Sequence, residues 1–298
     1  MVGRTSVLDL ADIVSALGSD ISCHARNSPQ YQLLERTWLE RVSAVKNSHI
    51  ESVRAILSDD VEVTLEYVDF GRGGIDTFSL FGLDELIVFL LYSSRSDVSR
   101  SVDVGANIGF HSILMAKTGW QVDAYEPDPV HLGLLENHLK LNGVDSSVTL
   151  FGEAVSDYDG SGSFTRVVDN STGSHLTGSK TNPYGELDVF DVTVKNIVRC
   201  LEDHRFLKLD AEGAEARIVG GMKGLNWESL DVVLEVGSAA NGELILSTIG
   251  ACDLKAYSQK TGWSLVRGIG DVPMSYKEGS LFISGGGREP WGRRVIGS

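Results

Sequence analysis

A short stretch of the chain combines a buried strand, a glycine-rich turn and the start of a helix. Val102 and Val104 flank Asp103 in a run typical of a buried parallel strand, and the segment from Gly105 to Gly109 then breaks that strand. Glycine backbones let a ligand approach closely, and the helix that follows directs free N–H groups toward the same place. The stretch therefore predicts a ligand-binding turn at the carboxyl end of a strand.

The residues around this turn indicate which ligand it binds. Asp103 stands just before the turn, where a carboxylate would repel a pyrophosphate but accept hydrogen bonds from an ammonium group. The turn also lacks one glycine of the G-x-G-x-x-G pattern that a dinucleotide requires. Glu126 ends the next expected strand, where an acid can hold a ribose diol. S-adenosylmethionine (SAM) carries an ammonium, a sulfonium and a ribose diol but no phosphate, so the pattern favours SAM over NAD.

Six residues are expected to contact this cofactor, each matched to one part of SAM. Glu153 follows the third expected strand, and its alternative interpretation is a solvated loop acid. The six are Asp103, Gly105, Asn107 and Gly109 around the methionine end, Glu126 at the ribose hydroxyls, and Glu153 at the adenine amino group.

Four blocks of sequence together resemble the FkbM family of SAM-dependent methyltransferases. The blocks are Val102–Gly109, Tyr125–Pro129, Asn137–Gly143 and Leu207–Glu215, in the family's order. The resemblance implies an α/β, class I methyltransferase (Rossmann-like) fold with a seven-stranded, mostly parallel sheet. It also implies O-methylation of a hydroxyl on a sugar, polysaccharide or polyketide-type metabolite. The chain departs from the family at Lys195, where an acid is usual.

Methyl transfer to a hydroxyl requires a group that takes the hydroxyl proton. Asp210 is the leading candidate because it ends the fourth expected strand, at the edge where α/β sheets bind ligands. Lys208 lies two residues earlier, on the same strand face, and would keep Asp210 ionised. The alternative interpretation is an acid that caps the next helix, a role also open to Glu212 and Glu215.

Three further side chains are candidates for the reaction. Glu235 ends the fifth expected strand, His175 lies at the tip of a long excursion, and His111 begins the helix after the glycine turn. Asp210 and Glu235 together could hold a divalent cation such as Mg²⁺ through carboxylate oxygens. No ligand spacing indicates a metal site, so no metal is expected.

Strand and helix patterns alternate in the second part of the chain, which predicts a parallel sheet covered on both faces. The expected parallel strands are 101–105, 121–125, 147–152, 205–210 and 231–236. Two final strands, Asp253 to Tyr257 and Leu281 to Ser284, are expected to pair antiparallel, as the resemblance implies. The predicted units are an N-terminal helical and β-hairpin extension at 1–95, the methyltransferase domain at 96–285 and a flexible tail at 286–298.

The predicted extension begins with a helical region over residues 7–60, ending in a helix that carries Ile50, Val53, Ile56 and Leu57. Segments 61–67 and 75–81 are expected to form a hairpin, followed by an apolar helix from Leu83 to Tyr92. This extension is interpreted as a structural cap, with a substrate lid or an oligomer arm as alternatives. Another hairpin is expected between Tyr158 and Arg199, with its tip over the carboxyl ends of the strands.

The composition excludes several classes of partner. The 298-residue chain has a net charge of −15, which argues against nucleic-acid binding and against anionic membranes. Its three cysteines show no metal or disulfide spacing, and no apolar signal segment is visible, so a cytoplasmic location is expected.

The expected partners are a small-molecule or oligosaccharide acceptor and, because the N-terminal region is amphipathic, a second copy in a homodimer. Two alternatives to a methyltransferase stay open from the sequence: a nicotinamide-dependent oxidoreductase and a non-catalytic SAM-binding protein. The sequence does not identify the acceptor.

Overall fold

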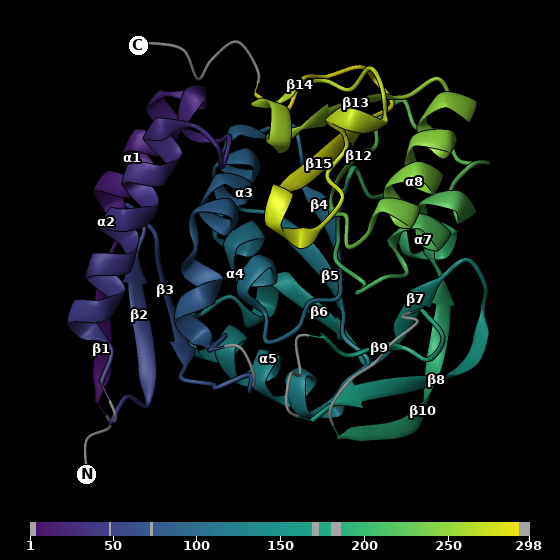
Figure 1. Ribbon diagram of the computed structural model, residues 1–298. Coiled ribbons are helices and arrows are strands. Elements are labelled where there is room, and N and C mark those ends of the chain that lie inside the picture. Colours follow the sequence, from purple (N-terminus) through teal and green to yellow (C-terminus); the bar gives the residue numbers. More distant parts are fainter. Residues whose placement is uncertain (1–3, 48, 72–73, 169–172, 180–185, 292–298) are drawn as a thin grey trace.

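A central sheet of eight strands carries the fold in the computed structural model, which describes residues 4–47, 49–71, 74–168, 173–179 and 186–291 (Figure 1). The strand order is β14-β13-β15-β12-β11-β4-β5-β6. In chain order the strands are β4 (Arg100–Val104), β5 (Gln121–Tyr125), β6 (Val148–Phe151), β11 (Phe206–Leu209), β12 (Asp231–Glu235), β13 (Lys255–Ser258), β14 (Ser264–Leu265) and β15 (Ser280–Ser284).

The pairing of these strands confirms most of the predicted sheet. Strands β6, β5, β4, β11 and β12 pair parallel and coincide with the five expected strands. Strand β15 runs antiparallel to both β12 and β13, so the two last expected strands pair as predicted. The sheet differs from the predicted seven-stranded one because the two-residue strand β14 adds an eighth strand at the edge, antiparallel to β13.

Apolar side chains fill both faces of this sheet. Phe206 and Leu207 are adjacent on β11 and fully buried, yet they belong to two different hydrophobic clusters. Because successive side chains of a strand point to opposite faces, the two clusters lie on opposite sides of the sheet. The helices that follow the strands are α4 (Phe110–Lys117), α5 (Pro129–Leu141), α6 (Ile197–Cys200), α7 (Glu215–Gly221) and α8 (Ala239–Ala251).

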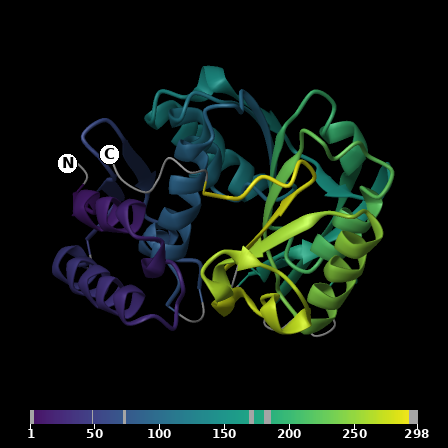
Figure 2. The same ribbon diagram turned by 90° about the horizontal axis from the view of Figure 1, so that it is seen from above.

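A second, three-stranded sheet lies in the N-terminal part of the chain. Its strands are β1 (Thr5–Asp9), β2 (Ser52–Ile56) and β3 (Glu62–Glu66), with β1 parallel and β3 antiparallel to β2. Helices α1 (Ala11–Ser19) and α2 (Pro29–Val45) accompany it. Seen from above, these purple helices and the yellow-green helix α8 lie at opposite ends of the molecule (Figure 2).

Two predictions for this region are wrong. The expected helix over residues 50–57 is strand β2, in which Val53 and Ala55 are fully buried and their neighbours are partly exposed. This period of two buries one face of a strand, whereas a helix would need a period of 3.6. The hairpin partner of β3 is therefore β2, while Thr77–Phe81 forms a short 3₁₀ turn that Asp76 caps.

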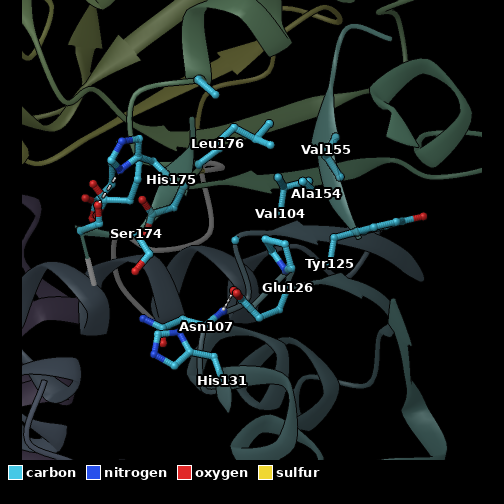
Figure 3. A pocket seen from close by; sticks show the side chains of 18 of the residues that line it. Val104, Asn107, Tyr125, Glu126, His131, Ala154, Val155, Ser174, His175 and Leu176 are labelled. Carbon is cyan, nitrogen blue, oxygen red and sulfur yellow. Dashed lines mark hydrogen bonds between the residues drawn. The ribbon is translucent and has the colours of Figure 1, made fainter. Parts of the chain in front are cut away.

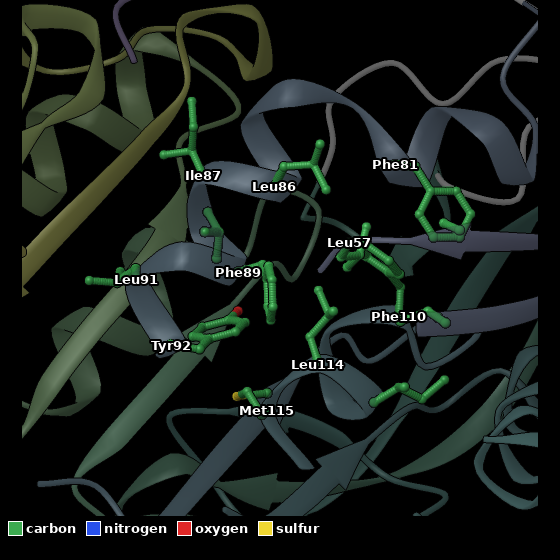
Figure 4. Close-up of a cluster of buried hydrophobic side chains, with 14 of the residues drawn as sticks. Leu57, Phe81, Leu86, Ile87, Phe89, Leu91, Tyr92, Phe110, Leu114 and Met115 are labelled. Atoms are coloured by element: carbon green, nitrogen blue, oxygen red, sulfur yellow. The ribbon is translucent and has the colours of Figure 1, made fainter. Parts of the chain in front are cut away.

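Helix α3 (Leu83–Ser94) joins the extension to the central sheet. Seven of its residues are buried, as the apolar run predicts. Figure 4 shows side chains of α3, among them Phe89 and Tyr92, gathered with Leu114 and Met115 of α4. The helix is therefore held rigidly at the edge of the domain that the sheet builds.

The excursion after the third parallel strand is a hairpin, as predicted. Strands β8 (Gly160–Val167) and β10 (Leu187–Asn196) pair antiparallel, and β7 (Ala154–Ser156) and β9 (His175–Leu176) complete a four-stranded sheet. Arg166 anchors this hairpin to the domain through two hydrogen bonds of 2.6 Å to the buried carboxylate of Asp128. Residues 169–172 and 180–185 of the expected tip lie outside the described residues.

A flexible tail was predicted at 286–298, and its described residues, 286–291, are instead packed against the domain. Arg288 donates two hydrogen bonds of 3.0 Å to the fully buried Asp231. The Trp291 ring lies edge-on against His24 and Trp263, and Trp263 Nε1 donates to His24 Nδ1 at 3.0 Å. Residues 292–298 lie outside the described part of the chain.

No helix among the described residues has the length and apolar character needed to cross a membrane.

The contact between Arg288 and Asp231 gives a test of this packing. Arg288→Ala should lower the free energy of unfolding by about 1–3 kcal/mol, because a buried carboxylate loses two charged hydrogen bonds. Denaturant unfolding measures the change, and Arg267→Ala on the exposed surface serves as the control, with an expected change below about 0.5 kcal/mol. Equal stability of the two variants would show that the segment is loose in solution.

Candidate active site

A cavity of about 440 Å³ opens where β4, β5, β11 and β12 reach their carboxyl ends. The 3₁₀ turn before α3 and the β8–β10 hairpin also contribute to its walls. Seven of the ten predicted site residues line it: Gly105, Asn107, Glu126, Glu153, His175, Asp210 and Glu235. The predicted residues from the glycine turn, four parallel strand ends and the hairpin are thus brought to one place.

Asp103, Gly109 and Lys208 do not line the cavity. Asp103 is fully buried beneath the turn, where its Oδ2 accepts a 2.6 Å hydrogen bond from Ser112 Oγ. Its predicted contact with the methionine end of SAM is therefore unsupported, because its carboxylate faces the protein interior. Gly109 has a φ of +96°, and a Cβ there would lie 2.9 Å from Cγ of Leu135, so this glycine serves helix packing.

Gly105 is required by the backbone of a neighbouring strand. Its φ is +75°, and a Cβ at this position would lie 1.8 Å from the carbonyl oxygen of Asp210. The sequence predicts this glycine from the close approach of a ligand. The structure adds that the end of β11 already occupies the space that a side chain would need.

Two backbone amides hold the carboxylate of Glu126. Its Oε2 accepts from the Asn107 N–H at 2.8 Å (Figure 3), and its Oε1 accepts from the Asp128 N–H at 2.9 Å. Burial raises the pKa of Glu126 to about 7, although these two hydrogen bonds act in the opposite direction. The carboxylate therefore titrates near neutral pH at the cavity wall.

Lys208 lies behind the cavity as a buried cation between two carboxylates. Its Nζ is 3.4 Å from Asp210 Oδ2 and 3.8 Å from Asp103 Oδ1. Burial alone would lower the pKa of Lys208, but the charges of Asp210 and Asp103 outweigh burial and raise it. The predicted ion pair of Lys208 and Asp210 is confirmed. Asp210 Oδ1 is buried with no hydrogen-bond partner in the described chain.

Glu235 lines the cavity near this pair. Burial, followed by the negative charges of Asp210 and Glu85, raises its pKa well above the usual value. This shift favours the protonated form, in which the Glu235 carboxyl group can donate a hydrogen bond.

His175 belongs to the hairpin wall. The side chain is buried, and its Nδ1 lies 3.0 Å from the carbonyl oxygen of Gly173. Figure 3 shows Ser174, His175 and Leu176 together on one side of the cavity, across from Glu126. The hairpin therefore covers the strand ends, as the sequence predicted.

The two acids that follow Asp210 have separate functions. Glu215 is fully buried and accepts from the Gly213 N–H at 2.9 Å and from Asn241 Nδ2 at 2.8 Å, so it stabilises the start of α7. Glu212 lines the cavity and accepts a 3.1 Å hydrogen bond from the Tyr276 hydroxyl. The capping interpretation thus applies to Glu215.

Sequence reasoning missed Glu85, which lines the cavity from α3. It is bonded to His111, whose Nε2 lies 2.8 Å from Glu85 Oε2. The available signal was a carboxylate in a helix whose other positions are largely apolar. Tyr276 and His131 also line the cavity and had no signal in the sequence.

Among the described residues, no group of three or more His, Cys, Asp or Glu side chains is arranged to hold a metal ion.

Comparison with protein families confirms the predicted resemblance. Residues 103–249 match the family model described as the methyltransferase FkbM domain. This match covers the glycine turn, Glu126, the hairpin and the Lys208–Asp210 pair, and it supports a methyltransferase. A comparison with curated protein sequences finds no match.

Solved structures with similar folds include several methyltransferases. The methyltransferase FkbM from Methylobacillus flagellatus KT is 19% identical with a TM-score of 0.40, and the alignment covers 64% of this chain and 47% of that chain. A SAM-dependent methyltransferase from Agrobacterium tumefaciens is 13% identical with a TM-score of 0.44, over 82% of this chain and 72% of that chain. The O-methyltransferase TomG from Streptomyces achromogenes, in complex with SAM, is 13% identical with a TM-score of 0.36, over 66% and 64% of the two chains. At these scores the similarities carry no argument about function.

The contact of Gly105 with the β11 backbone can be tested by substitution. Gly105→Ala should destabilise the protein by about 3 kcal/mol or more, because the new methyl group overlaps the Asp210 carbonyl and the positive φ adds strain. Gly119→Ala is the matched control: its φ is +95° but the space around it is open, so a cost of about 1–2 kcal/mol is expected. Urea unfolding of both variants measures the difference, and equal losses would contradict a steric role for Gly105.

Proposed function

We propose that the FkbM methyltransferase domain at residues 103–249 binds SAM and transfers its methyl group to a hydroxyl of a sugar, polysaccharide or polyketide-type metabolite. One observation carries the proposal. A single cavity has the amide-held carboxylate of Glu126 at one strand end and the Lys208–Asp210 ion pair at another. The first suits a ribose diol and the second suits an acceptor hydroxyl.

The residues at the cavity fit SAM in several respects. Glu126 offers carboxylate oxygens to the ribose hydroxyls, and Glu153 lines the same cavity for the adenine amino group. Asn107 Oδ1 is buried without a hydrogen-bond partner in the described chain, so it can accept from the ammonium group of SAM. The cavity volume of about 440 Å³ lies in the range of small-ligand sites. When bound, SAM supplies an activated methyl group and a neutral thioether as the leaving group.

The protein's own contribution is to align the acceptor and to handle its proton. Lys208 pairs with the carboxylate of Asp210, which lines the cavity and can accept a hydrogen bond from the acceptor hydroxyl. Glu235 can donate a hydrogen bond, and His175 faces the cavity from the hairpin. Phe164 and Leu176 add apolar surface on the hairpin side, which limits the access of water.

The N-terminal extension contributes to the same cavity. Ile75, Ser79, Leu80 and Glu85 form part of its wall. This contact supports a substrate-binding role for a segment that the sequence analysis interpreted mainly as a structural cap. A small-molecule or oligosaccharide acceptor, a homodimer and a cytoplasmic location stay predictions.

Binding measurements test the proposal against its alternatives. Calorimetric titration with SAM, S-adenosylhomocysteine and NAD should show binding of the first two. Binding of NAD without SAM would overturn the proposal in favour of a nicotinamide-dependent oxidoreductase. Cell extracts with SAM carrying a labelled methyl group then identify the acceptor by mass analysis of the product. Tight SAM binding without labelled product from any extract would favour a non-catalytic SAM-binding protein.

Replacement of Glu126 should weaken cofactor binding. Glu126→Ala removes hydrogen bonds to the ribose diol worth roughly 1.5–3 kcal/mol each, so SAM affinity should fall at least about tenfold. Because burial raises the pKa of Glu126 to about 7, its carboxylate forms as the pH rises through this value. SAM affinity of the wild type should therefore increase between about pH 6 and pH 8. Calorimetry at several pH values measures this, with Glu126→Gln as the control that should remove the increase.

Replacement of Asp210 should affect turnover more than cofactor binding. Asp210→Asn keeps the shape of the side chain but removes its charge, so turnover should fall by about 10²-fold while SAM affinity changes little. Asp203→Asn, at an exposed position before β11, is the control and should leave both quantities unchanged. Near-normal turnover of Asp210→Asn in the labelled-methyl assay, with and without added Mg²⁺, would refute a role for Asp210 and make His175 the next residue to test.

A further inference from the structure

Helix α3 presents two polar side chains on one face toward the central domain. Glu85 and Tyr92 are seven residues apart, and seven residues make almost two complete helical turns, so both point in the same direction. His111, in the first turn of α4, spans the gap between them. Its Nε2 lies 2.8 Å from Glu85 Oε2, and its Nδ1 lies 3.0 Å from the Tyr92 hydroxyl.

The partners of these two hydrogen bonds show which atoms donate and which accept from Tyr92 through His111 to Glu85. A carboxylate oxygen only accepts, so Nε2 of His111 carries the proton that it donates to Glu85. In the tautomer with its proton on Nε2, Nδ1 accepts from the Tyr92 hydroxyl. Burial, and after it the charges of Asp103 and Glu85, raise the pKa of Tyr92 well above its usual value, so this donor keeps its proton. Tyr92 therefore fixes the tautomer of His111, and His111 fixes the orientation of the Glu85 carboxylate.

Of the three hydrogen-bonded side chains, the one that reaches the cavity is the carboxylate of Glu85. Glu85 lines the cavity together with Asp210 and Glu235, and no hydrogen bond within the described residues involves its Oε1. The backbone that carries Glu85 is held firmly, since Leu86 and Ile87 beside it are fully buried. One oxygen of a well-anchored carboxylate is thus left for a ligand.

The charges around Glu85 come from several elements. Burial raises the pKa of Glu85, but the hydrogen bond from His111, together with the charges of Lys208 and Arg26, outweighs burial and lowers it. Glu235 lines the same cavity as Glu85, and its pKa is raised well above the usual value. The groups that act on Glu85 are Tyr92 on α3, His111 on α4, Lys208 on β11, Glu235 on β12 and Arg26 before α2.

We propose that Glu85 is a catalytic residue that accepts the proton of the acceptor hydroxyl, with His111 and Tyr92 as positioning residues that orient its carboxylate. This inference rests on the proposed methyltransferase function. The acceptor O–H bond breaks, and its proton goes to Glu85 Oε1. An oxygen electron pair forms the new bond to the methyl carbon, and the pair of the broken C–S bond stays on the sulfur.

The two neighbouring acids are less suited to this step. Asp210 is paired through Oδ2 with the buried ammonium of Lys208, so its position is fixed and it suits an orienting role. Burial and the charges of Asp210 and Glu85 raise the pKa of Glu235, which favours its protonated form. The pKa of Glu85 is instead lowered, which favours its carboxylate form. Asp210 therefore orients the acceptor while Glu85 receives its proton.

Three measurements on the full chain test the inference. The first is binding of S-adenosylhomocysteine by calorimetry, which should be unchanged within about twofold in Glu85→Gln. The second is transfer of the labelled methyl group to the acceptor found in extracts and to a panel of methyl glycosides. Glu85→Gln should lower this turnover by about 10²-fold or more, and Glu85→Asp should retain part of it. Glu243→Gln, on the exposed surface of α8, is the charge control and should behave as wild type.

The third measurement follows the Glu85 carboxyl carbon by NMR in protein with ¹³C-labelled glutamate and bound S-adenosylhomocysteine. The signal is identified by its loss in Glu85→Gln. His111→Phe removes the donor to Glu85, so the titration midpoint should rise by about one pH unit. The pH at which turnover increases on the acid side of its profile should rise as well, because the Glu85 carboxylate then forms at higher pH. His111→Gln, which restores an N–H donor, should reverse part of both shifts.

The outcomes separate the inference from the proposed function. Failure of the wild type to bind S-adenosylhomocysteine would overturn both. Normal turnover of a folded Glu85→Gln protein that binds S-adenosylhomocysteine would overturn the inference and leave the proposed function standing. The carboxyl titration needs no acceptor, and an unchanged midpoint in His111→Phe would by itself overturn the proposed chain from Tyr92 to Glu85.

Discussion

The arrangement of the cavity floor depends on one buried positive charge. Lys208 carries its ammonium into a region with little water, and such a charge is tolerated only when carboxylates surround it. Asp103 comes from the strand before the glycine turn and Asp210 from the end of the neighbouring strand, so one cation holds two strand ends together. The charges of Asp210 and Asp103 in turn raise the pKa of Lys208, while burial and the charge of Asp210 raise the pKa of Glu235. One group of buried charges therefore affects both the packing of the strand ends and the titration of the cavity wall.

The sequence was sufficient to predict the central sheet because its strands are short apolar runs between turns. Val102, Val104 and their counterparts repeat this local signal at each parallel strand, and local signals do not depend on distant contacts. Strand β2 was mistaken for a helix because Ile50, Val53 and Leu57 also fit a helical spacing. Only the pairing of β2 with β1 and β3 decides between the two, and that pairing joins residues far apart in the sequence.

In the site, too, the residues that could be predicted are those with a signal in the nearby sequence, and the others depend on contacts between distant segments. Glu126 and Asp210 could be predicted because each directly follows a strand of the parallel sheet, where the fold places ligand-binding groups. The contacts of Asp103 with Ser112 and Lys208 could not be predicted, because its position on a strand does not reveal them. Glu85 was missed because nothing near it in the sequence shows that α3 packs beside α4 and the cavity. Its partner His111 was noted, but without the carboxylate that gives it a role.

The contact of His24 with Trp263 has a consequence for the order in which the chain folds. The two residues are 239 positions apart, and Gln259 likewise joins the His24 backbone and Asp84, beside Glu85 on α3. Contacts with such large sequence separation form slowly, because the intervening chain must first be brought together. The N-terminal helices can therefore reach their final packing only after the strands near the other end have been synthesised. Until then the cavity wall at Glu85 lacks its support, so the site is completed as one of the last events of folding.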